Sequence, residues 1–203
     1  MSKPTLYGIS NSRAFRSLWA LEEIGIDYIH IPSSHLDDAK QPEFLAINPN
    51  GRIPALTDGD LNLFEAIAIN LYLARKYGED LYALNTGEEA LIWQWSFWAM
   101  SELEPLQINL ANLAYFTPEE ERDQSAIDVA IAALARPLGV LDGVLAGKEH
   151  LVANRFTIAD LNLASVLDAL NVLQVDYSQH QQVHRWATAC YSRPSYERAK
   201  AIT

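Results

Sequence analysis

The first eighty residues alternate between short apolar segments rich in β-branched residues and longer segments with helical periodicity. Residues 5–9 and 26–31 have the composition of strands, and residues 13–24, which end at Gly25, have that of a helix. Because a helix connects the two strands, we expect them to be parallel. A polar segment follows, and a short helical turn is expected at residues 42–46.

A second pattern, from residue 53 to residue 77, predicts a hairpin followed by a helix. Asp58-Gly59 is typical of a hairpin turn and separates an apolar run that contains Pro54 from an alternating run. A segment without Gly or Pro and rich in helix formers begins after Glu65. Because Pro54 cannot donate to a ladder, its strand is expected at a sheet edge or to bend there. The prediction is an α/β domain with a four-stranded mixed sheet, βαβ then ββα.

Beyond residue 86 the pattern predicts helices only. Residues 87–112 are expected to form one long helix or two, with a kink or break at Pro105. Thr157 and Asp160 have the spacing of a capping box that opens a helix to about residue 173. Further helical segments are expected at residues 118–145, with an interruption at 137–139, and at 183–192 and 194–201. The predicted organisation is an α/β domain at 1–79, a linker at 80–86 and an all-α helical bundle at 87–203.

Composition narrows the class of protein. With 203 residues, 49% hydrophobic content and a formal charge of −11, the chain has the composition of a soluble globular protein. The negative charge argues against nucleic-acid and anionic-membrane partners. The N-terminal segment contains no signal-peptide core and no apolar run is long enough to span a membrane, so we expect a cytoplasmic protein. The single cysteine, Cys190, excludes an internal disulfide, and the five histidines show no metal-ligand spacing.

Two positions in the second pattern have more than one interpretation. If Pro54 interrupts its strand, the backbone of Ile53 is left free to pair with an extended peptide. Glu65 lies at a helix start, where free N–H groups attract anions. Together they suit a peptide-like ligand with an amine and a carboxylate. The alternative is an edge strand with a proline and a surface glutamate, with no ligand.

Three segments, in this order and at this spacing, resemble the cytosolic glutathione S-transferases over essentially the whole chain. They are LYGISNSRAFRSLWALEEIGIDY, PEFLAINPNGRIPALTDGDLNLFEAIAINLYLARKY and NRFTIADLNLASVL. The form is bacterial, theta/phi-like or a related serine type. The resemblance implies a thioredoxin-like N-terminal domain, an all-helical C-terminal domain, a homodimer and a detoxification role. It also implies glutathione as co-substrate and no prosthetic group.

The resemblance assigns the parts of glutathione to residues of the second pattern. The backbone of Ile53, before a cis-Pro54, would pair with the cysteinyl part, and Glu65 would hold the γ-glutamyl amine. The N–H of the next residue would hold the γ-glutamyl carboxylate. Many members have Ser there, whereas this chain has Ala66, so one hydroxyl donor is missing. Lys40 and Arg52 would face the glycine carboxylate or the peptide backbone. Arg13 completes the predicted glutathione-binding set on different grounds: the helix dipole disfavours a cation in a first helical turn, which indicates either a bound anion or an ion pair with a nearby carboxylate.

The residue that activates the thiol is expected between the first strand and the first helix. A hydroxyl or cation near the sulfur, together with a helix N-terminus, lowers the pKa of a thiol and so favours the nucleophilic thiolate. The candidates are Ser10, Asn11 and Ser12, with Ser12 slightly favoured over Ser10. Their alternative role is helix capping, which we expect for at least two of the three. Tyr7 lies inside the predicted strand and is not assigned this role.

The resemblance places the electrophile pocket along the long first helix of the second domain, at Trp98, Glu102, Leu106 and Tyr115. The alternative for such aromatic residues at helical spacing is core packing or a subunit contact. The predicted function is therefore conjugation of glutathione to hydrophobic electrophiles, with some peroxide reduction. Two alternatives stay open: a non-catalytic glutathione-binding or scaffold protein, and isomerase or dehalogenase chemistry that uses glutathione.

Overall fold

The structure, a computed structural model, describes residues 3–202, and the chain divides into two compact units. Unit 1 comprises Met1–Leu84 together with Ser192–Thr203, and unit 2 comprises Asn85–Tyr191. The boundary after Leu84 falls inside the predicted linker at 80–86. The last helix differs from the predicted organisation, because it belongs to unit 1 and not to the helical part.

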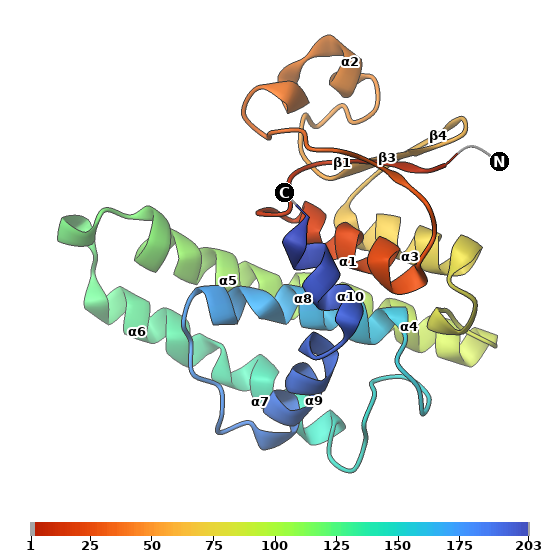
Figure 1. Cartoon of the computed structure of the whole chain (residues 1–203). Helices are drawn as coiled ribbons and strands as arrows, with labels where there is room; N and C mark the ends of the chain where they lie inside the picture. The colour runs from red at the N-terminus through yellow and green to blue at the C-terminus, as the bar shows by residue number, and fades with distance from the viewer. Residues whose placement is uncertain (1–2, 203) are drawn as a thin grey trace. The chain divides into compact units, whose positions relative to one another are not determined.

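Unit 1 is a four-stranded sheet with helices on both faces (Figure 1). Its elements are β1 (Thr5–Tyr7), α1 (Ala14–Ile24), β2 (Ile29–Ile31), the 3-10 turn η1 (Asp38–Lys40), α2 (Pro42–Leu45), β3 (Ala55–Asp58), β4 (Leu61–Phe64), α3 (Ala66–Tyr77), the 3-10 turn η2 (Glu79–Leu81) and α10 (Pro194–Ala201). The strand order is β2-β1-β3-β4. The predicted four-stranded mixed sheet is confirmed.

The strand pairing follows from the connections. β1 and β2 are parallel, as the helix between them requires, and β3 and β4 form an antiparallel hairpin. Gly59 takes φ 61 at the hairpin turn. Of the two possibilities predicted for the strand that contains Pro54, the edge position is wrong, because β3 lies between β1 and β4. The predicted bend is found, because the chain bends at Ile53. The ladder begins at Ala55, so the missing N–H of Pro54 falls outside it.

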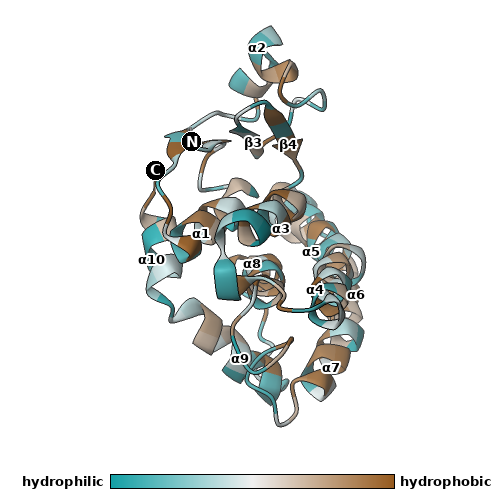
Figure 2. Cartoon of the chain, turned by 90° about the vertical axis from the view of Figure 1, so that its right-hand side faces the viewer, coloured by the Kyte–Doolittle hydropathy of each residue, from teal (hydrophilic) through white to brown (hydrophobic). Residues whose placement is uncertain are grey.

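Helices α1 and α3 cover one face of the sheet, and α2 lies on the other (Figure 1). Two hydrogen bonds join α1 to α3: Ser17 donates to the carbonyl of Ala66, and the Asn70 amide donates to the carbonyl of Arg16 at 3.1 Å. α2 carries hydrophobic and hydrophilic residues side by side (Figure 2). Its Phe44 packs with Ala39 and Ala55 beneath it.

Helix α10 is fastened to α1 by buried polar and aromatic contacts. The indole N–H of Trp19 donates to the hydroxyl of Ser195 at 3.1 Å, and the Trp19 and Tyr196 rings meet edge to face at 5.0 Å. Arg193 binds the carboxylate of Glu23 through two nitrogens, and Ser195 donates to the same carboxylate. These contacts explain why residues 192–203 belong to unit 1.

The Glu23 contacts predict a pH-dependent stability. Burial raises the pKa of Glu23, but the hydrogen bonds from Arg193 and Ser195 and the charges of Arg193 and Arg198 outweigh it, so the pKa lies below 4.5. A lowered carboxyl pKa stabilises the fold above the unfolded-state pKa, and this stability is lost as the pH falls through the folded pKa. Glu23→Gln should cost about 1–2 kcal/mol at pH 7, and this cost should shrink as the pH is lowered through the folded pKa of Glu23. Urea unfolding across this pH range checks it. Glu197→Gln, at an exposed position, is the control. If the free energy of unfolding changes with pH equally in the two variants, the prediction is contradicted.

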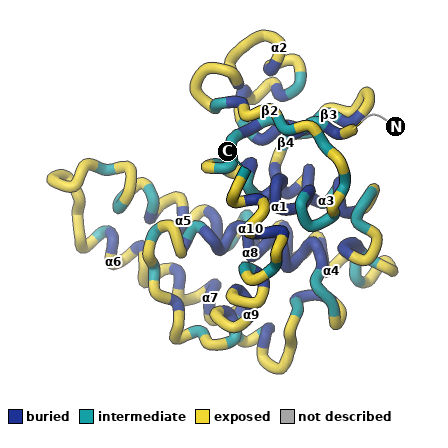
Figure 3. The backbone as a smooth tube through the Cα atoms, in the orientation of Figure 1, coloured by how far each residue is buried: buried dark blue, intermediate teal, exposed yellow. Residues whose placement is uncertain are grey.

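Unit 2 is helical throughout. Its elements are α4 (Thr86–Trp98), the π-helical segment η3 (Ala99–Leu103), α5 (Glu104–Ala111), the π-helical segment η4 (Asn112–Phe116), the 3-10 turn η5 (Glu119–Glu121), α6 (Gln124–Ala133), α7 (Ala135–Val144), α8 (Ile158–Val172) and α9 (Gln181–Tyr191). Helix α8 is buried along most of its length and supplies the core of the unit (Figure 3). The predicted helical C-terminal part is confirmed.

Both predicted helix breaks differ in detail from what the structure shows. The chain stays helical from Thr86 to Phe116, and π-helical η3 lies immediately before Pro105, which occupies the first turn of α5. The π-helical turn of η3 accommodates the ring and the missing N–H of Pro105 within the continuous helix, so no sharp break is needed. The second break falls at Leu134 and not at residues 137–139, because Pro137 likewise lies within the first turn of α7.

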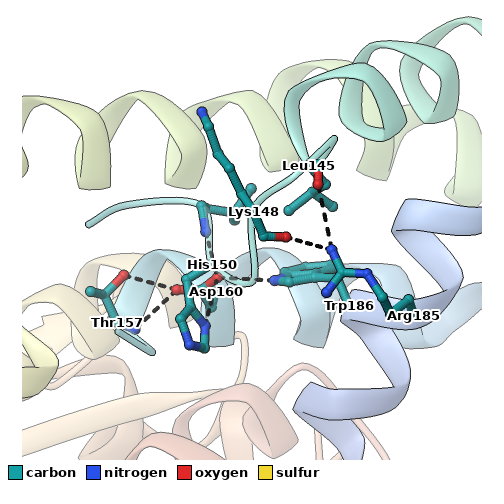
Figure 4. Close-up of polar contacts among 8 residues, drawn as sticks. Leu145, Lys148, His150, Thr157, Asp160, Arg185 and Trp186 are labelled. Carbon is teal, nitrogen blue, oxygen red and sulfur yellow. Dashed lines mark hydrogen bonds and ion pairs between the residues drawn. The ribbon is translucent and has the colours of Figure 1, made fainter. Parts of the chain in front are cut away.

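The capping box of α8 is the centre of a larger buried network (Figure 4). Asp160 is fully buried, and one of its oxygens accepts from the backbone N–H of Leu151 at 2.8 Å and from the indole of Trp186 at 2.9 Å. The other accepts from the N–H and hydroxyl of Thr157 at 2.9 and 3.1 Å. Burial raises the pKa of Asp160, although these hydrogen bonds oppose the shift. The network ties α8 to the preceding loop and to α9.

Within residues 3–202, no helix is both long enough and apolar enough to cross a membrane. The same residues contain no group of three His, Cys, Asp or Glu side chains that could hold a metal ion. Cys190 is buried in α9.

Candidate functional site

The turn between β1 and α1 is packed closely against the segment before β3. Gly8 takes φ 139, and a Cβ placed on it would lie 2.6 Å from the Cβ of Ala14 and 3.2 Å from that of Ile53. Such distances exclude any side chain, so only glycine allows these three backbones to meet. The ring of His30 also reaches this turn, with Nε2 2.7 Å from the carbonyl oxygen of Gly8. The turn therefore has a defined position beside Ile53.

The three candidates for thiol activation differ in their hydrogen bonds. Ser12 is part of the turn itself: its hydroxyl donates to the carbonyl of Ile9 at 2.6 Å and accepts from the N–H of Ala14 at 3.0 Å. Helix capping, the alternative role given for Ser10, Asn11 and Ser12, therefore applies to Ser12. The side chains of Ser10, which is half-buried, and Asn11, which is exposed, make no hydrogen bond within the described residues.

The backbone at Ile53 has the geometry that the sequence suggested. The bond between Ile53 and Pro54 is cis, and Ile53 precedes the first ladder residue, Ala55. Within residues 3–202, its N–H and carbonyl have no hydrogen-bond partner. The ladder pairs Ala55 with Phe64, so the next positions along the two strands, Pro54 and Glu65, lie opposite each other.

Glu65 lies at the N-terminus of α3 in an unusual backbone conformation, with φ 72 and ψ 110. Such positive φ values in residues other than glycine cost energy and cluster at functional sites. Its carboxylate makes no hydrogen bond or ion pair within the described residues. Ala66 is the first residue of α3, so its N–H belongs to the helix N-terminus, where anions are favoured.

Two of the candidate cations are Lys40, at the end of η1, and Arg52, in the loop between α2 and β3. Lys40 donates from Nζ to the carbonyl of Gly51 at 2.6 Å, and Arg52 is exposed. Asn48 is buried, donates to the carbonyl of Arg52 at 2.6 Å and accepts from the N–H of Asn50 at 3.0 Å. The third cation, Arg13, occupies the N-cap position of α1 and is exposed.

Sequence reasoning missed the residues that hold this loop and turn in place, namely Gly8, His30, Asn48 and Gly51. Asn48 had a usable signal, because Asn commonly forms local side-chain to backbone turns. Gly51 also had one, because Asn50-Gly51 is a turn dipeptide, and the φ of Gly51 is 56. His30 lies in a strand and reaches Gly8 across two elements, so no local pattern could indicate it.

The four residues predicted for the electrophile pocket all lie along the continuous helix of unit 2. Trp98 ends α4 and packs edge to face on Trp95 at 5.4 Å between ring centres, and Leu106 is half-buried in α5. Glu102 in η3 forms an ion pair with Arg136 at 3.0 Å. Tyr115 in η4 is 63% exposed. Trp98, Glu102 and Leu106 recur every four positions, which favours one face of the helix.

Comparison with known proteins identifies the family. A family model described as "Glutathione S-transferase, N-terminal domain" matches residues 2–75, and one described as "Glutathione S-transferase, C-terminal domain" matches residues 103–194. Glutathione S-transferase 4 of Zea mays is 33% identical over 186 residues, which cover 89% of this chain and 83% of that protein. Glutathione S-transferase GstB of Escherichia coli K12 is 30% identical over 203 residues, with 98% of each chain covered.

The chain belongs to the glutathione S-transferase family.

Solved structures agree with this assignment. A theta class glutathione S-transferase from Xanthomonas axonopodis pv. citri, solved with glutathione bound, has a TM-score of 0.90 at 31% identity and covers 100% of this chain and 99% of its own. Glutathione S-transferase-I bound with lactoylglutathione has a TM-score of 0.88 at 30% identity, with both chains fully covered. The predicted fold and the predicted enzyme class, a glutathione transferase, are confirmed by these relatives.

Proposed function

We propose that this glutathione S-transferase binds glutathione at the end of the sheet in unit 1 and conjugates the intact tripeptide, through its thiolate sulfur, to the electrophilic carbon of hydrophobic co-substrates. The observation that carries the proposal is the convergence of three features there. They are the unpaired backbone of Ile53 before cis-Pro54, the unpaired carboxylate of Glu65 at the start of α3, and the turn that Gly8 holds against Ile53. Reduction of organic peroxides by the same thiolate is the accompanying activity that we expect.

Each part of the tripeptide has a partner of suitable chemistry. The N–H and carbonyl of Ile53 would pair with the cysteinyl backbone, as one strand pairs with another. The carboxylate of Glu65 would bind the γ-glutamyl ammonium in a charge-assisted hydrogen bond. The N–H of Ala66 would bind the γ-glutamyl carboxylate, which the helix dipole of α3 also favours. The Ala66 side chain contributes no donor.

The cations complete the site for a ligand that carries two carboxylates. Lys40 ends η1 and donates to Gly51 in the loop that leads into Ile53, and Arg52 belongs to that loop. We assign both cations to the glycine carboxylate or the peptide backbone. Arg13 lies at the start of α1, beside the β1–α1 turn that contains Ser10 and Ser12, and adds positive potential there. Because the whole chain carries a formal charge of −11, these local cations are what makes the site acceptable to an anion.

We assign thiol activation to Ser10. The proton of the Ser12 hydroxyl is already donated to Ile9, so Ser12 shapes the turn. The hydroxyl of Ser10 has no such partner within the described residues and is available to donate to the thiolate. Asn11 is the second candidate, since its amide can also donate. Either donor would lower the pKa of the bound thiol and increase the thiolate fraction.

For the electrophile, we propose a pocket that includes Trp98, Glu102, Leu106 and Tyr115. The aromatic and aliphatic side chains provide an apolar contact surface, and the exposure of Tyr115 leaves its ring and hydroxyl accessible. Glu102 is neutralised in part by Arg136, which reduces the cost of placing an apolar ligand beside it.

Calorimetric titration with glutathione, followed by a chromogenic aryl-halide conjugation assay, tests the proposed function. We expect binding at or below millimolar concentration and measurable conjugation. Binding without the ultraviolet absorbance of a thiolate near neutral pH would instead support the non-catalytic alternative, for which the missing hydroxyl at Ala66 is the motivating feature. No binding at millimolar glutathione would reject both.

Glu65→Gln should weaken glutathione binding by about tenfold to a hundredfold, because it replaces a charge-assisted hydrogen bond to an ammonium with a neutral one. Calorimetry measures the effect. Asp60→Asn removes the same charge from an exposed position in the β3–β4 turn and is the matched control. Equal affinities for the two variants would show that Glu65 does not contact the ligand.

We also propose that the protein forms a homodimer. Helix α4 exposes Trp93 at 42% and Phe97 at 63% of their surface, and these positions are one helical turn apart. Large aromatic side chains on one helix face are typical of subunit contacts. Light scattering on purified protein checks the mass, and Phe97→Glu should shift it from dimer to monomer. A monomeric parent protein would rule the dimer out.

A further inference from the structure

Unit 1 contains an open surface pocket, called the cavity below, that the proposed glutathione site does not use; the Asp38 and Glu43 residues at its rim are exposed. It has a volume of about 450 Å³ and lies on the face of the sheet that carries α2, where β1, β2, η1 and α2 meet. A volume of this size is within the range of small-molecule sites. None of the residues assigned to glutathione lines it.

The inner walls of the cavity are apolar and fixed by packing. Tyr7 and Phe44 meet edge to face with ring centres 6.0 Å apart, and Phe44 belongs to the small buried cluster under α2. Ile31 on the edge strand β2 and Ile47 after α2 complete this lining. Ile31 is 39% exposed, so this aliphatic side chain has apolar surface that a bound ligand could cover. The walls therefore suit an apolar ring or chain.

The polar lining of the cavity carries negative charge without compensation. Asp38 and Glu43 both line it, and no Lys, Arg or His does. Glu43 makes no hydrogen bond or ion pair within residues 3–202, and Asp38 uses one oxygen to accept from the N–H of Ser34 at 2.7 Å. The nearest cation in the sequence, Lys40, donates to Gly51. The hydroxyl of Tyr7 also lacks a hydrogen-bond partner among these residues.

We propose that this cavity binds a small amphipathic cation, a primary or secondary ammonium group on an aromatic or aliphatic body. The ammonium would be held by Asp38 and Glu43, and the body would pack against Tyr7, Phe44 and Ile31. Aromatic faces also attract cations, so the walls and the charges favour the same ligand. Anions are excluded by the two carboxylates and by the overall charge of −11.

The test uses three probes with one apolar body: 2-phenylethylammonium, 2-phenylethanol and phenylacetate. Each is titrated into the full chain by calorimetry and backbone NMR, with glutathione at saturating concentration so that its own site is filled. We expect 2-phenylethylammonium to bind with roughly millimolar affinity, and 2-phenylethanol to bind about fivefold to tenfold more weakly. Phenylacetate should not bind. Shifted amide signals should come from Tyr7, Ile31 and Phe44.

Variants of the lining residues separate the contribution of the two carboxylates to binding from that of the apolar space. The Asp38→Asn, Glu43→Gln double variant should bind 2-phenylethylammonium about fivefold to tenfold more weakly and 2-phenylethanol unchanged. Ile31→Trp, on an exposed edge strand that tolerates an aromatic residue, should fill the hollow and abolish binding of both. Asp60→Asn is the charge-matched control and should change neither affinity.

Several results would overturn the proposal. They are equal binding of the alcohol and the ammonium, an unchanged affinity in the double variant, and NMR shifts confined to other residues. Loss of ammonium binding when glutathione is added would show that the probe occupies the glutathione site instead. Thermal unfolding of each variant verifies that it is folded before its affinity is interpreted.

Discussion

Replacing Ser10 by Ala is expected to lower kcat/KM for aryl-halide conjugation by about 10²–10³-fold, with little change in the affinity for glutathione. A hydrogen-bond donor aimed at a developing or full negative charge in an active site is typically worth this factor. The donor stabilises the thiolate and not the thiol, so its loss returns the pKa of the bound thiol toward its free value of about 8.5. The conjugation rate of Ser10→Ala should therefore recover as the pH rises.

The neighbouring variants test this assignment. Ser12→Ala removes the hydroxyl that accepts from Ala14 and donates to Ile9, so its main effect should be a loss of about 1 kcal/mol in stability. Asn11→Ala should retain most of the rate. Ultraviolet absorbance of the bound thiolate at neutral pH is measured for all three. If the thiolate persists in Ser10→Ala and disappears in Asn11→Ala or Ser12→Ala, the role belongs to that residue.

Asp160→Ala is expected to destabilise unit 2 by about 3–5 kcal/mol. The substitution leaves the donors of Leu151, Thr157 and Trp186 without their acceptor in a fully buried position. Each buried unsatisfied donor costs about 1–3 kcal/mol, and part of this is regained because a buried charge is removed. Urea unfolding followed by tryptophan fluorescence measures the loss.

An exposed aspartate in the same unit provides the matched control. Asp123 is the N-cap of α6 and accepts from the N–H groups of Ser125 and Ala126, so Asp123→Ala loses a cap without a buried network. Its cost should be about 0.5–2 kcal/mol. Asp160→Asn should fall between the two, because it keeps one acceptor oxygen. A loss in Asp160→Ala no larger than in Asp123→Ala would mean that Asp160 acts only as a cap.

The parts of the fold that depend on neighbouring residues were predictable from the sequence. Gly25 ends α1 in a left-handed conformation, Asp58-Gly59 makes the hairpin, and Thr157 with Asp160 forms the capping box. Each is a local interaction with a known residue preference. The family resemblance added the bond geometry at Pro54, which the residues alone left open.

The candidate site shows where such prediction stops. Ser10 and Ser12 are chemically identical, and only the turn geometry shows that the hydroxyl of Ser12 is already used by Ile9. The same limit applies to α10. The sequence predicts a short helix at residues 194–201, but the partner of that helix, α1, is 170 residues away along the chain. Contacts at that separation leave no pattern in a single sequence.

The attachment of residues 192–203 to α1 also sets an order of events during synthesis. Unit 1 needs these residues to give Trp19 and Glu23 their partners, yet the ribosome makes them only after all of unit 2. Domains usually fold as units in the order in which they leave the ribosome. Here the unit that begins the chain is completed last, so a nascent chain halted before residue 192 carries a thioredoxin-like unit in which Trp19 and Glu23 still lack the hydrogen-bond partners that Arg193 and Ser195 provide.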